Sequence, residues 1–197
     1  MIDIDILLTI GAAYKKINAG DIIFHEGAEC RFYYQLISGC VRWSNIDDEG
    51  NEFIQNMIEP GECFGEMPLF DDEPYAATAI ADTDCVIARL HKSEFLELLT
   101  ERPDIHFAFT KMMSQRIRFK FLLIRELANH DPEKSITTLL SYLKRTRKHV
   151  CEKCNKVKLT RQQIANMTGM RVETVIRAIR HLHDKGSLVI EKGKVFC

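Results

Sequence analysis

Residues 159–190, LTRQQIANMTGMRVETVIRAIRHLHDKGSLVI, decide the fold of the C-terminal part of the chain. Thr160 is followed three residues later by Gln163, which is the spacing of a capping box, so the sequence predicts a helix that begins at Thr160. Gly169 then favours a turn, because glycine adopts a left-handed backbone conformation without strain. A second helix is predicted from about Arg171 to Gly186.

The predicted second helix has an apolar stripe and a polar surface. Its apolar residues recur at helical spacing and are expected in the core: Val175, Ile176, Ile179 and Leu182. Two short apolar runs follow and predict a small hairpin or wing: Leu188–Ile190 and Val195-Phe196. Two short helices joined by a glycine-containing turn form a helix-turn-helix, whose second helix enters the major groove of DNA.

The polar surface of this helix suggests how bases are read. Glu173 and Arg177 are four residues apart, so a carboxylate that accepts from cytosine N4 lies beside a guanidinium that donates to guanine O6 and N7. Val172 is a candidate contact for a thymine methyl group, and Thr174 for a phosphate or a base. The alternative is a solvated Glu173–Arg177 ion pair, worth a few tenths of a kcal/mol; the helix-turn-helix context favours base reading. The predicted DNA-contacting residues are Thr160, Arg161, Gln162, Arg171, Val172, Glu173, Thr174, Arg177 and Arg180.

The pattern LTRQQIAxxTGxxxETVxRxIxxLxxKGxL resembles the C-terminal helix-turn-helix of the Crp/Fnr family of bacterial transcription regulators. Val172 stands where the Crp-like branch carries an additional Arg, so the helix is more similar to the Fnr-like branch. Ile176 stands where the Fnr type has a base-contacting Ser. The resemblance implies a regulator that binds a palindromic operator in double-stranded DNA as a homodimer, has no enzymatic activity, and has RNA polymerase as a further candidate partner.

Charge divides the chain into two halves. Residues 140–197 hold 14 Lys and Arg against 4 Asp and Glu, whereas residues 1–139 hold 13 against 24. A basic segment is attracted to the phosphate backbone of DNA, and an acidic partner is repelled by it. No apolar run approaches the roughly 20 residues of a membrane span, and the N-terminus does not resemble a signal peptide. We therefore expect a cytoplasmic protein with mostly reduced cysteines.

The N-terminal half is predicted to be β-rich. After an expected amphipathic helix at Met1–Tyr14, short runs separated by glycines indicate an antiparallel sandwich or barrel: Ile22–Phe24, Phe32–Ile37, Val41–Trp43, Phe53–Ile58, Ala76–Ala81 and Cys85–Leu90. Asn18–Asp21, Glu26-Gly27, Ser38–Val41 and Pro60–Glu66 are similar to the β-roll effector domain of the same family. The expected fold is α+β: an antiparallel β-roll of the cupin-like jelly-roll type (1–102), a dimerisation helix and hinge (103–130), and a winged helix-turn-helix (131–197).

The family resemblance also indicates an effector pocket. In members that bind cyclic nucleotides, a Gly-Glu pair holds the ribose and an Arg-Ser pair binds the phosphate; Gly65-Glu66 match the first pair, whereas Tyr75-Ala76 stand near the second. The base-contacting pair of the long helix falls near Lys120-Phe121. Residues 67–83 contain no cation, and burial of a phosphate without one is expensive. We therefore expect an unknown small-molecule effector other than cyclic AMP, with Glu66 as a turn carboxylate.

Pro103–Asn129 has the length and periodicity of one long helix. Its apolar surface is too broad for one neighbour, so one part is expected to cover the β-roll and another to pair with a second subunit, with Met112 and Phe119 as partner-facing positions. The alternative is the core helix of a monomer. Asn129–Pro132 is the predicted hinge, and a further helix is expected at Ser135–Lys148.

Cysteine and histidine placement limits the candidate cofactors. No cysteine precedes Cys30, so an N-terminal iron–sulfur cluster of the Fnr type is not expected. Cys151 and Cys154, next to His149, are weak candidates for half of a zinc site, with Cys197 as a remote further ligand; a hairpin turn is favoured. A cupin-type metal enzyme needs closely spaced histidines, which the sequence lacks. The alternative function is a ligand-, redox- or metal-sensing module whose DNA contacts are secondary.

Overall fold

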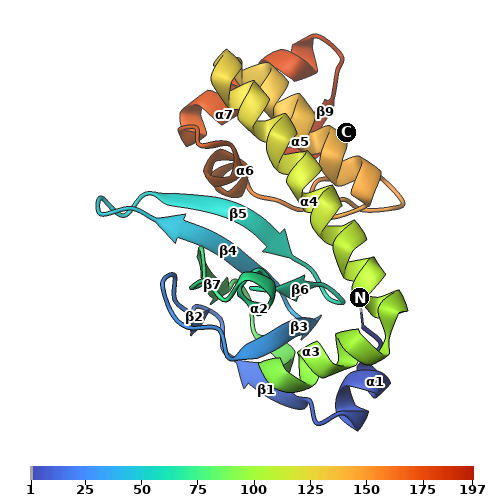
Figure 1. Ribbon diagram of the computed structural model, residues 1–197. Coiled ribbons are helices and arrows are strands. Elements are labelled where there is room, and N and C mark those ends of the chain that lie inside the picture. Colours follow the sequence, from blue (N-terminus) through green and yellow to red (C-terminus); the bar gives the residue numbers. More distant parts are fainter. Residues whose placement is uncertain (1) are drawn as a thin grey trace. The chain divides into compact units, whose positions relative to one another are not determined.

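The computed structural model describes residues 2–197, and the chain forms two compact units, Met1–Met113 and Ser114–Cys197 (Figure 1). The boundary between them lies inside the long helix α4 (Pro103–Asn129). The division into domains at residues 102 and 130 stays a prediction. Among residues 2–197, no helix is long and apolar enough to span a membrane.

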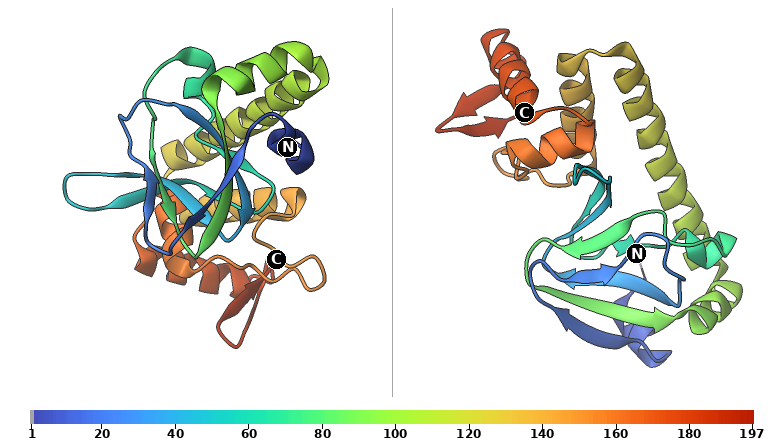
Figure 2. Two further views of the ribbon diagram at one scale, coloured as in Figure 1. Left: turned by 90° about the horizontal axis from the view of Figure 1, so that it is seen from below. Right: turned by 90° about the vertical axis from the view of Figure 1, so that its left-hand side faces the viewer.

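The first unit is built on two four-stranded antiparallel sheets, as the sequence predicts. One sheet has the order β1 (Ala13–Ile17), β8 (Cys85–His91), β3 (Phe32–Ser38) and β6 (Cys63–Phe64). The other has the order β2 (Ile22–Phe24), β7 (Thr78–Ala81), β4 (Val41–Ile46) and β5 (Glu52–Ile58). Except for the consecutive strands β4 and β5, strand neighbours are far apart in sequence, and the two sheets enclose the core as a β-roll (Figure 2).

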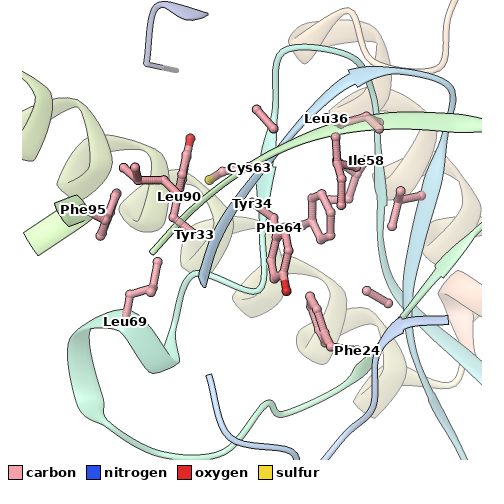
Figure 3. Close-up of a cluster of buried hydrophobic side chains, with 14 of the residues drawn as sticks. Phe24, Tyr33, Tyr34, Leu36, Ile58, Cys63, Phe64, Leu69, Leu90 and Phe95 are labelled. Atoms are coloured by element: carbon pink, nitrogen blue, oxygen red, sulfur yellow. The ribbon is translucent and has the colours of Figure 1, made fainter. Parts of the chain in front are cut away.

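Aromatic side chains fill much of this core (Figure 3). Tyr34 and Phe64 stack with ring centroids 5.5 Å apart, and Phe24 lies 5.6 Å from Tyr34. Tyr33 stacks on Phe95 of helix α3 (Lys92–Glu101) at 4.8 Å, which attaches this helix to the roll. Because full burial of one such side chain contributes about 1.5–3 kcal/mol, these contacts are a large part of the stability of the unit.

The N-terminal helix is shorter than predicted. Helix α1 spans Ile4–Thr9, and Met1 lies outside the described residues. The prediction of helix up to Tyr14 is wrong, because Gly11 has a φ of +96° and the next residues pair with β8 as strand β1. The sequence also gave no indication of β6 or of α3. Helix α2 (Pro68–Asp71) is a single turn, and the carbonyl of its first residue, Pro68, accepts from Nζ of Lys92 at 2.8 Å.

The second unit contains the end of α4, three further helices and a hairpin. α4 has the predicted bounds, whereas α5 spans Pro132–Thr146 instead of Ser135–Lys148, because Asp131 caps its N-terminus and proline fits the first helical position. The remaining elements are α6 (Arg161–Thr168), α7 (Val172–Asp184), β9 (Val189–Glu191) and β10 (Lys194–Phe196). The predicted fold class, an α+β chain with a β-roll, a long helix and a winged helix-turn-helix, is confirmed.

One of the two expected partner-facing positions of α4 is wrong, Phe119, whereas Met112 is half-buried and stays a prediction. Phe119 is buried and stacks on Tyr142 of α5, with ring centroids 3.6 Å apart. Met112 packs against the core of the β-roll, its Sδ 3.5 Å from Sγ of Cys63. The apolar side chains that α4 exposes within the second unit are different ones: Ile117, Phe121, Ile124 and Leu127.

Candidate nucleic-acid interface

Helix α6 begins and ends as the sequence predicts. The Gln163 N–H donates to Oγ1 of Thr160 at 3.1 Å, and the Thr160 N–H donates to Oε1 of Gln163 at 2.9 Å. This reciprocal capping box satisfies two backbone donors that a helix start leaves free. Gly169, with a φ of +62°, ends the helix and allows the sharp turn into α7.

Helix α7 is anchored through one stripe and exposes the opposite one. Val175, Ala178, Ile179 and Leu182 are buried, at the spacing of a helix packed on α5 and α6. Ile176 is 44% exposed, so the prediction that it belongs to the buried stripe is wrong. A residue directly after Val175 is rotated by about 100° from it and leaves the core side, while Ala178 takes the buried position.

The predicted DNA-contacting residues lie at the start of α6 and along α7 from its N-cap Arg171 to Arg180. Exposed members are Thr160, Gln162, Arg171, Glu173, Arg177 and Arg180, and half-buried members are Arg161, Val172 and Thr174. Burial lowers the pKa of Arg161, although a guanidinium stays protonated at neutral pH. Ile176 lies between Glu173 and Arg180 on the exposed surface and was missed as a candidate. Its apolar side chain fits a thymine methyl group.

Helix α7 is also tied to the start of α5. The Glu133 carboxylate lies 2.5 Å from Nδ1 of His181 and accepts from Nζ of Lys185 at 2.8 Å. The hydrogen bond from Lys185, and then the one from His181, lowers the pKa of Glu133 below its usual value. An open groove of about 450 Å³ lies between these elements, with Thr174 and Arg177 on its wall. These contacts orient the helix from the side that the core does not cover.

The predicted wing is present. β9 and β10 form an antiparallel hairpin (Figure 2). In its register Val195 lies opposite Ile190. Lys192 and Gly193 both have positive φ angles, as the tight two-residue hairpin turn requires. The N–H of Ile190 lies 3.3 Å from Nδ1 of His183, which links the wing to the end of α7. The turn exposes Lys192 and Lys194, two charges suited to phosphate contacts.

The two cysteines considered as half of a zinc site lie in the favoured hairpin turn. Val150 and Val157 form an antiparallel bridge on either side of Cys151 and Cys154, which confirms the turn. Within the part of the chain that the structure describes, no three or more His, Cys, Asp or Glu side chains form a group that could hold a metal ion.

The expected effector pocket contains packed aromatic rings. Tyr75 is 3% exposed and stacks on Phe24, with ring centroids 3.8 Å apart (the Phe24 position is labelled in Figure 3). Gly65 has a φ of +64°, and an added Cβ would lie 2.5 Å from Cζ of Phe24 and 3.0 Å from Cε1 of Tyr75. Gly65 therefore permits both the turn and the close approach of these rings.

The other predicted pocket residues are divided between the two units. Glu66, next to Gly65, is 2% exposed, whereas Ala76 is exposed and its carbonyl accepts from Nδ2 of Asn45 at 2.7 Å. Lys120 and Phe121 belong to the second unit. Burial, and then Arg116, lowers the pKa of Lys120 to about 8. The assignment of these residues to one effector pocket stays a prediction.

Comparison with known proteins gives consistent matches along the chain. Residues 14–102 match the family model of the cyclic nucleotide-binding domain, and residues 135–196 match the Crp-like helix-turn-helix domain. The chain is 31% identical over 181 residues to the cAMP-activated global transcriptional regulator CRP of Haemophilus influenzae, covering 91% of this chain and 80% of that protein.

Solved structures give the same result. The c-di-GMP responsive global regulator CLP of Xanthomonas campestris aligns with a TM-score of 0.76 and 22% identity, over 98% of this chain and 96% of that one. A transcriptional regulator of the CRP/FNR family from Thermus thermophilus aligns with a TM-score of 0.67 and 26% identity, over 93% and 92% of the two chains.

Proposed function

The chain belongs to the Crp/Fnr family of DNA-binding transcription regulators, and from this premise we propose that it binds a palindromic operator as a homodimer and that its effector is not cyclic AMP. The observation that carries the proposal is the exposed surface of α7, on which Glu173, Ile176 and Arg177 are free of the core. Glu173 and Arg177 read a G·C pair, and Ile176 or Val172 contacts a thymine methyl group.

The homodimer is supported by the exposed apolar side of α4. Ile117, Phe121 and Ile124 are 54%, 70% and 60% exposed, and their spacing of four and three residues is that of a coiled-coil seam. A second copy that supplies the same three residues would remove them from water. The two-fold axis of such a pair requires operator half-sites about 34 Å apart.

The proposal for the effector starts from the first unit. Relatives differ in the nucleotide that their names mention, cAMP in one case and c-di-GMP in another. In this chain the stacked rings of Phe24 and Tyr75 occupy the position next to Gly65. A neutral phenol there cannot replace the charge of an arginine. We infer that this regulator either responds to a different small molecule or acts without an effector. We propose a cytoplasmic location and RNA polymerase as a candidate partner.

A selection of bound sequences from random DNA, with and without cell extract, tests this function. We expect an inverted repeat with a G·C pair in each half-site, and specific binding that weakens steeply as salt rises. The alternative, a sensing module with secondary DNA contacts, predicts that no sequence is enriched. The arm with cell extract reveals whether a small molecule changes the selection.

A further inference from the structure

Residues 151–154, Cys-Glu-Lys-Cys, form a tight turn that we call the cysteine turn. The Cys151 N–H donates to the Lys156 carbonyl at 2.8 Å, and the Asn155 N–H donates to the Cys151 carbonyl at 2.8 Å. Asn155 has a φ of +56°, a left-handed conformation that asparagine tolerates better than most residues. Together with the Val150–Val157 bridge, these bonds hold the ends of the turn close together.

Cys151 and Cys154 are three positions apart in a turn that the Asn155–Cys151 backbone hydrogen bond closes. Hydrogen bonding from the Cys154 thiol and from the backbone N–H groups of Cys154 and Lys153 lowers the pKa of Cys151, and the charge of Lys158 contributes less. The bond from Asn155 to Cys151 has the i→i+4 pattern of one helical turn, in which residues three positions apart have α-carbons about 5 Å apart. A disulfide spans about 4.4–6.8 Å between α-carbons. A disulfide therefore fits without a large backbone movement.

Solvent can reach both thiols. Cys154 is exposed and Cys151 is half-buried, whereas Cys30, Cys63 and Cys85 are buried in the β-roll. The thiolate is the reactive form of cysteine, and accessible thiolates are the ones that exchange with disulfides. The cysteine turn is thus suited to oxidation in a way that the cysteines of the β-roll core are not.

The cysteine turn is connected to the wing by backbone hydrogen bonds. The N–H of Val157 donates to the carbonyl of Val195 at 2.9 Å, and that of Cys197 donates to the carbonyl of Asn155 at 3.2 Å. Lys156 and Phe196 form a further antiparallel bridge. A change in the turn therefore acts directly on strand β10.

We propose that Cys151 and Cys154 are a redox-active dithiol, which a low-molecular-weight disulfide oxidises reversibly, and that the bond formed restrains β10. The Cys151 thiolate attacks the small disulfide and forms a mixed disulfide, which releases one small thiol. Cys154 then loses its proton and displaces the second thiol from Cys151. Two protein thiols are oxidised by two electrons, and one small disulfide becomes two thiols that carry the two protons. Neither the disulfide nor its effect on β10 rests on the proposed function.

Glutathione redox buffers and peptide mapping of the full-length protein test the bond. Trypsin cleaves after Lys153, between the two cysteines, so their peptides stay joined only through a disulfide. In oxidised glutathione we expect both cysteines to lose reactivity towards an alkylating reagent. The joined peptide should weigh two hydrogen atoms less than the sum of the two reduced peptides. Reduced glutathione should restore both thiols. Cys197→Ser should behave like the wild type, and Cys154→Ser should stop at the mixed disulfide on Cys151.

Amide hydrogen exchange tests the effect on the wing without any DNA. Exchange at the amides of Val157 and Cys197, the two donors that join the turn to the wing, should be slower in the oxidised wild type than in the reduced one, and equal in both buffers for Cys154→Ser. The proposal is overturned if Cys151 and Cys154 stay alkylatable in oxidised glutathione, if either pairs with Cys197 instead, or if exchange does not change. Tight binding of zinc by the two reduced thiols would also overturn it. Loss of operator preference with an intact disulfide would refute the proposed function alone.

Discussion

The surface of α7 and the interior beside Gly65 contrast with each other. On α7 the polar side chains Glu173 and Arg177 are in solvent, ready to exchange water for base edges. Beside Gly65, the rings of Tyr75 and Phe24 stack on each other and are shielded from water. The first arrangement leaves interactions to be made with a partner, whereas the second satisfies them inside the chain. We therefore assign recognition by polar contacts to α7 and a mainly structural role to the aromatic rings near Gly65.

The largest effect is expected where an apolar surface remains exposed, on α4. Phe121→Glu places two carboxylates against each other in the proposed dimer, where each is deprived of water. We expect a monomer whose operator affinity falls by about 100-fold or more, or about 2.7 kcal/mol, while weak salt-sensitive DNA binding remains. Sedimentation combined with gel-shift titration measures both properties.

Gln115→Glu is the matched control for this substitution. Gln115 is exposed on α4 but lies two residues before Ile117, outside the apolar seam. It should leave dimerisation unchanged. A fully monomeric Phe121→Glu protein that bound the palindrome with wild-type affinity would contradict the dimer mechanism. Phe119→Glu is unsuitable, because it would unstack the buried ring from Tyr142 and unfold the second unit.

Gly65→Ala tests the packing of the Phe24 and Tyr75 rings beside Gly65. The new Cβ would lie 2.5 Å from Cζ of Phe24, in a backbone conformation that alanine rarely adopts. We expect a loss of about 2–4 kcal/mol in the free energy of unfolding, measured with urea. Gly61→Ala, with a φ of +89° and no atom within 4 Å, carries only the backbone strain and should lose about 1–2 kcal/mol. Equal losses would contradict the role of aromatic packing.

Local features of the sequence predicted the second unit well. Thr160, Gln163 and Gly169 sit in the capping box and turn that their spacing indicated, and the wing follows where expected. Each of these depends on residues a few positions apart, so the pattern contains nearly all the information. The prediction that Ile176 is buried was wrong, because spacing alone does not decide which residues border the buried stripe. Ala178 takes the buried position instead, where α7 packs on the neighbouring helices.

Contacts distant in sequence explain the features that were not predicted. β1 depends on pairing with β8, about 70 residues later, and its burial pattern lacks the alternation that identifies a strand. The partner of Phe119 is Tyr142, which no pattern within α4 reveals. The ring of Tyr75 likewise packs on Phe24, which belongs to strand β2, far from Tyr75 in the sequence. The family resemblance indicated that Tyr75-Ala76 stand near the position of the Arg-Ser pair, but not which side chain Tyr75 packs against.

Arg177→Ala should weaken binding to the selected operator by about 1–3 kcal/mol and remove the preference at one G·C position. The exposed guanidinium has no other predicted task, so non-specific binding should stay close to that of the wild type. Arg180→Ala is the contrasting variant: loss of a phosphate contact should weaken binding to all sequences alike and reduce the salt dependence. Binding competitions across single-base operator variants separate the two. An Arg177→Ala protein with the wild-type preference at every position would contradict base reading.

Thr160→Ala removes one hydroxyl from the capping box of α6. The N–H of Gln163 then loses its acceptor at the helix start, so we expect the second unit to lose about 1 kcal/mol of stability. Thermal unfolding should detect this loss, and Thr160→Ser, which retains the hydroxyl, should restore most of it. If serine and alanine were equally destabilising, the contribution would come from packing of the methyl group instead.

The smallest effect is expected when cyclic AMP is added to the protein. Burial raises the pKa of Tyr75 far above neutrality, and the nearby Cys30 thiol raises it further, so the phenol is uncharged at pH 7. An uncharged group cannot neutralise a phosphate, and residues 67–83 contain no Lys, Arg or His. The bound nucleotide would therefore have a desolvated anion without a partner in this segment. Calorimetric titration should give no dissociation constant tighter than about 1 mM, equivalent to about 4 kcal/mol, for cyclic AMP or cyclic GMP. A micromolar value would contradict this and would mean that a cation outside residues 67–83 neutralises the phosphate. Lys120 is the candidate that the sequence offers, and Lys120→Met tests it.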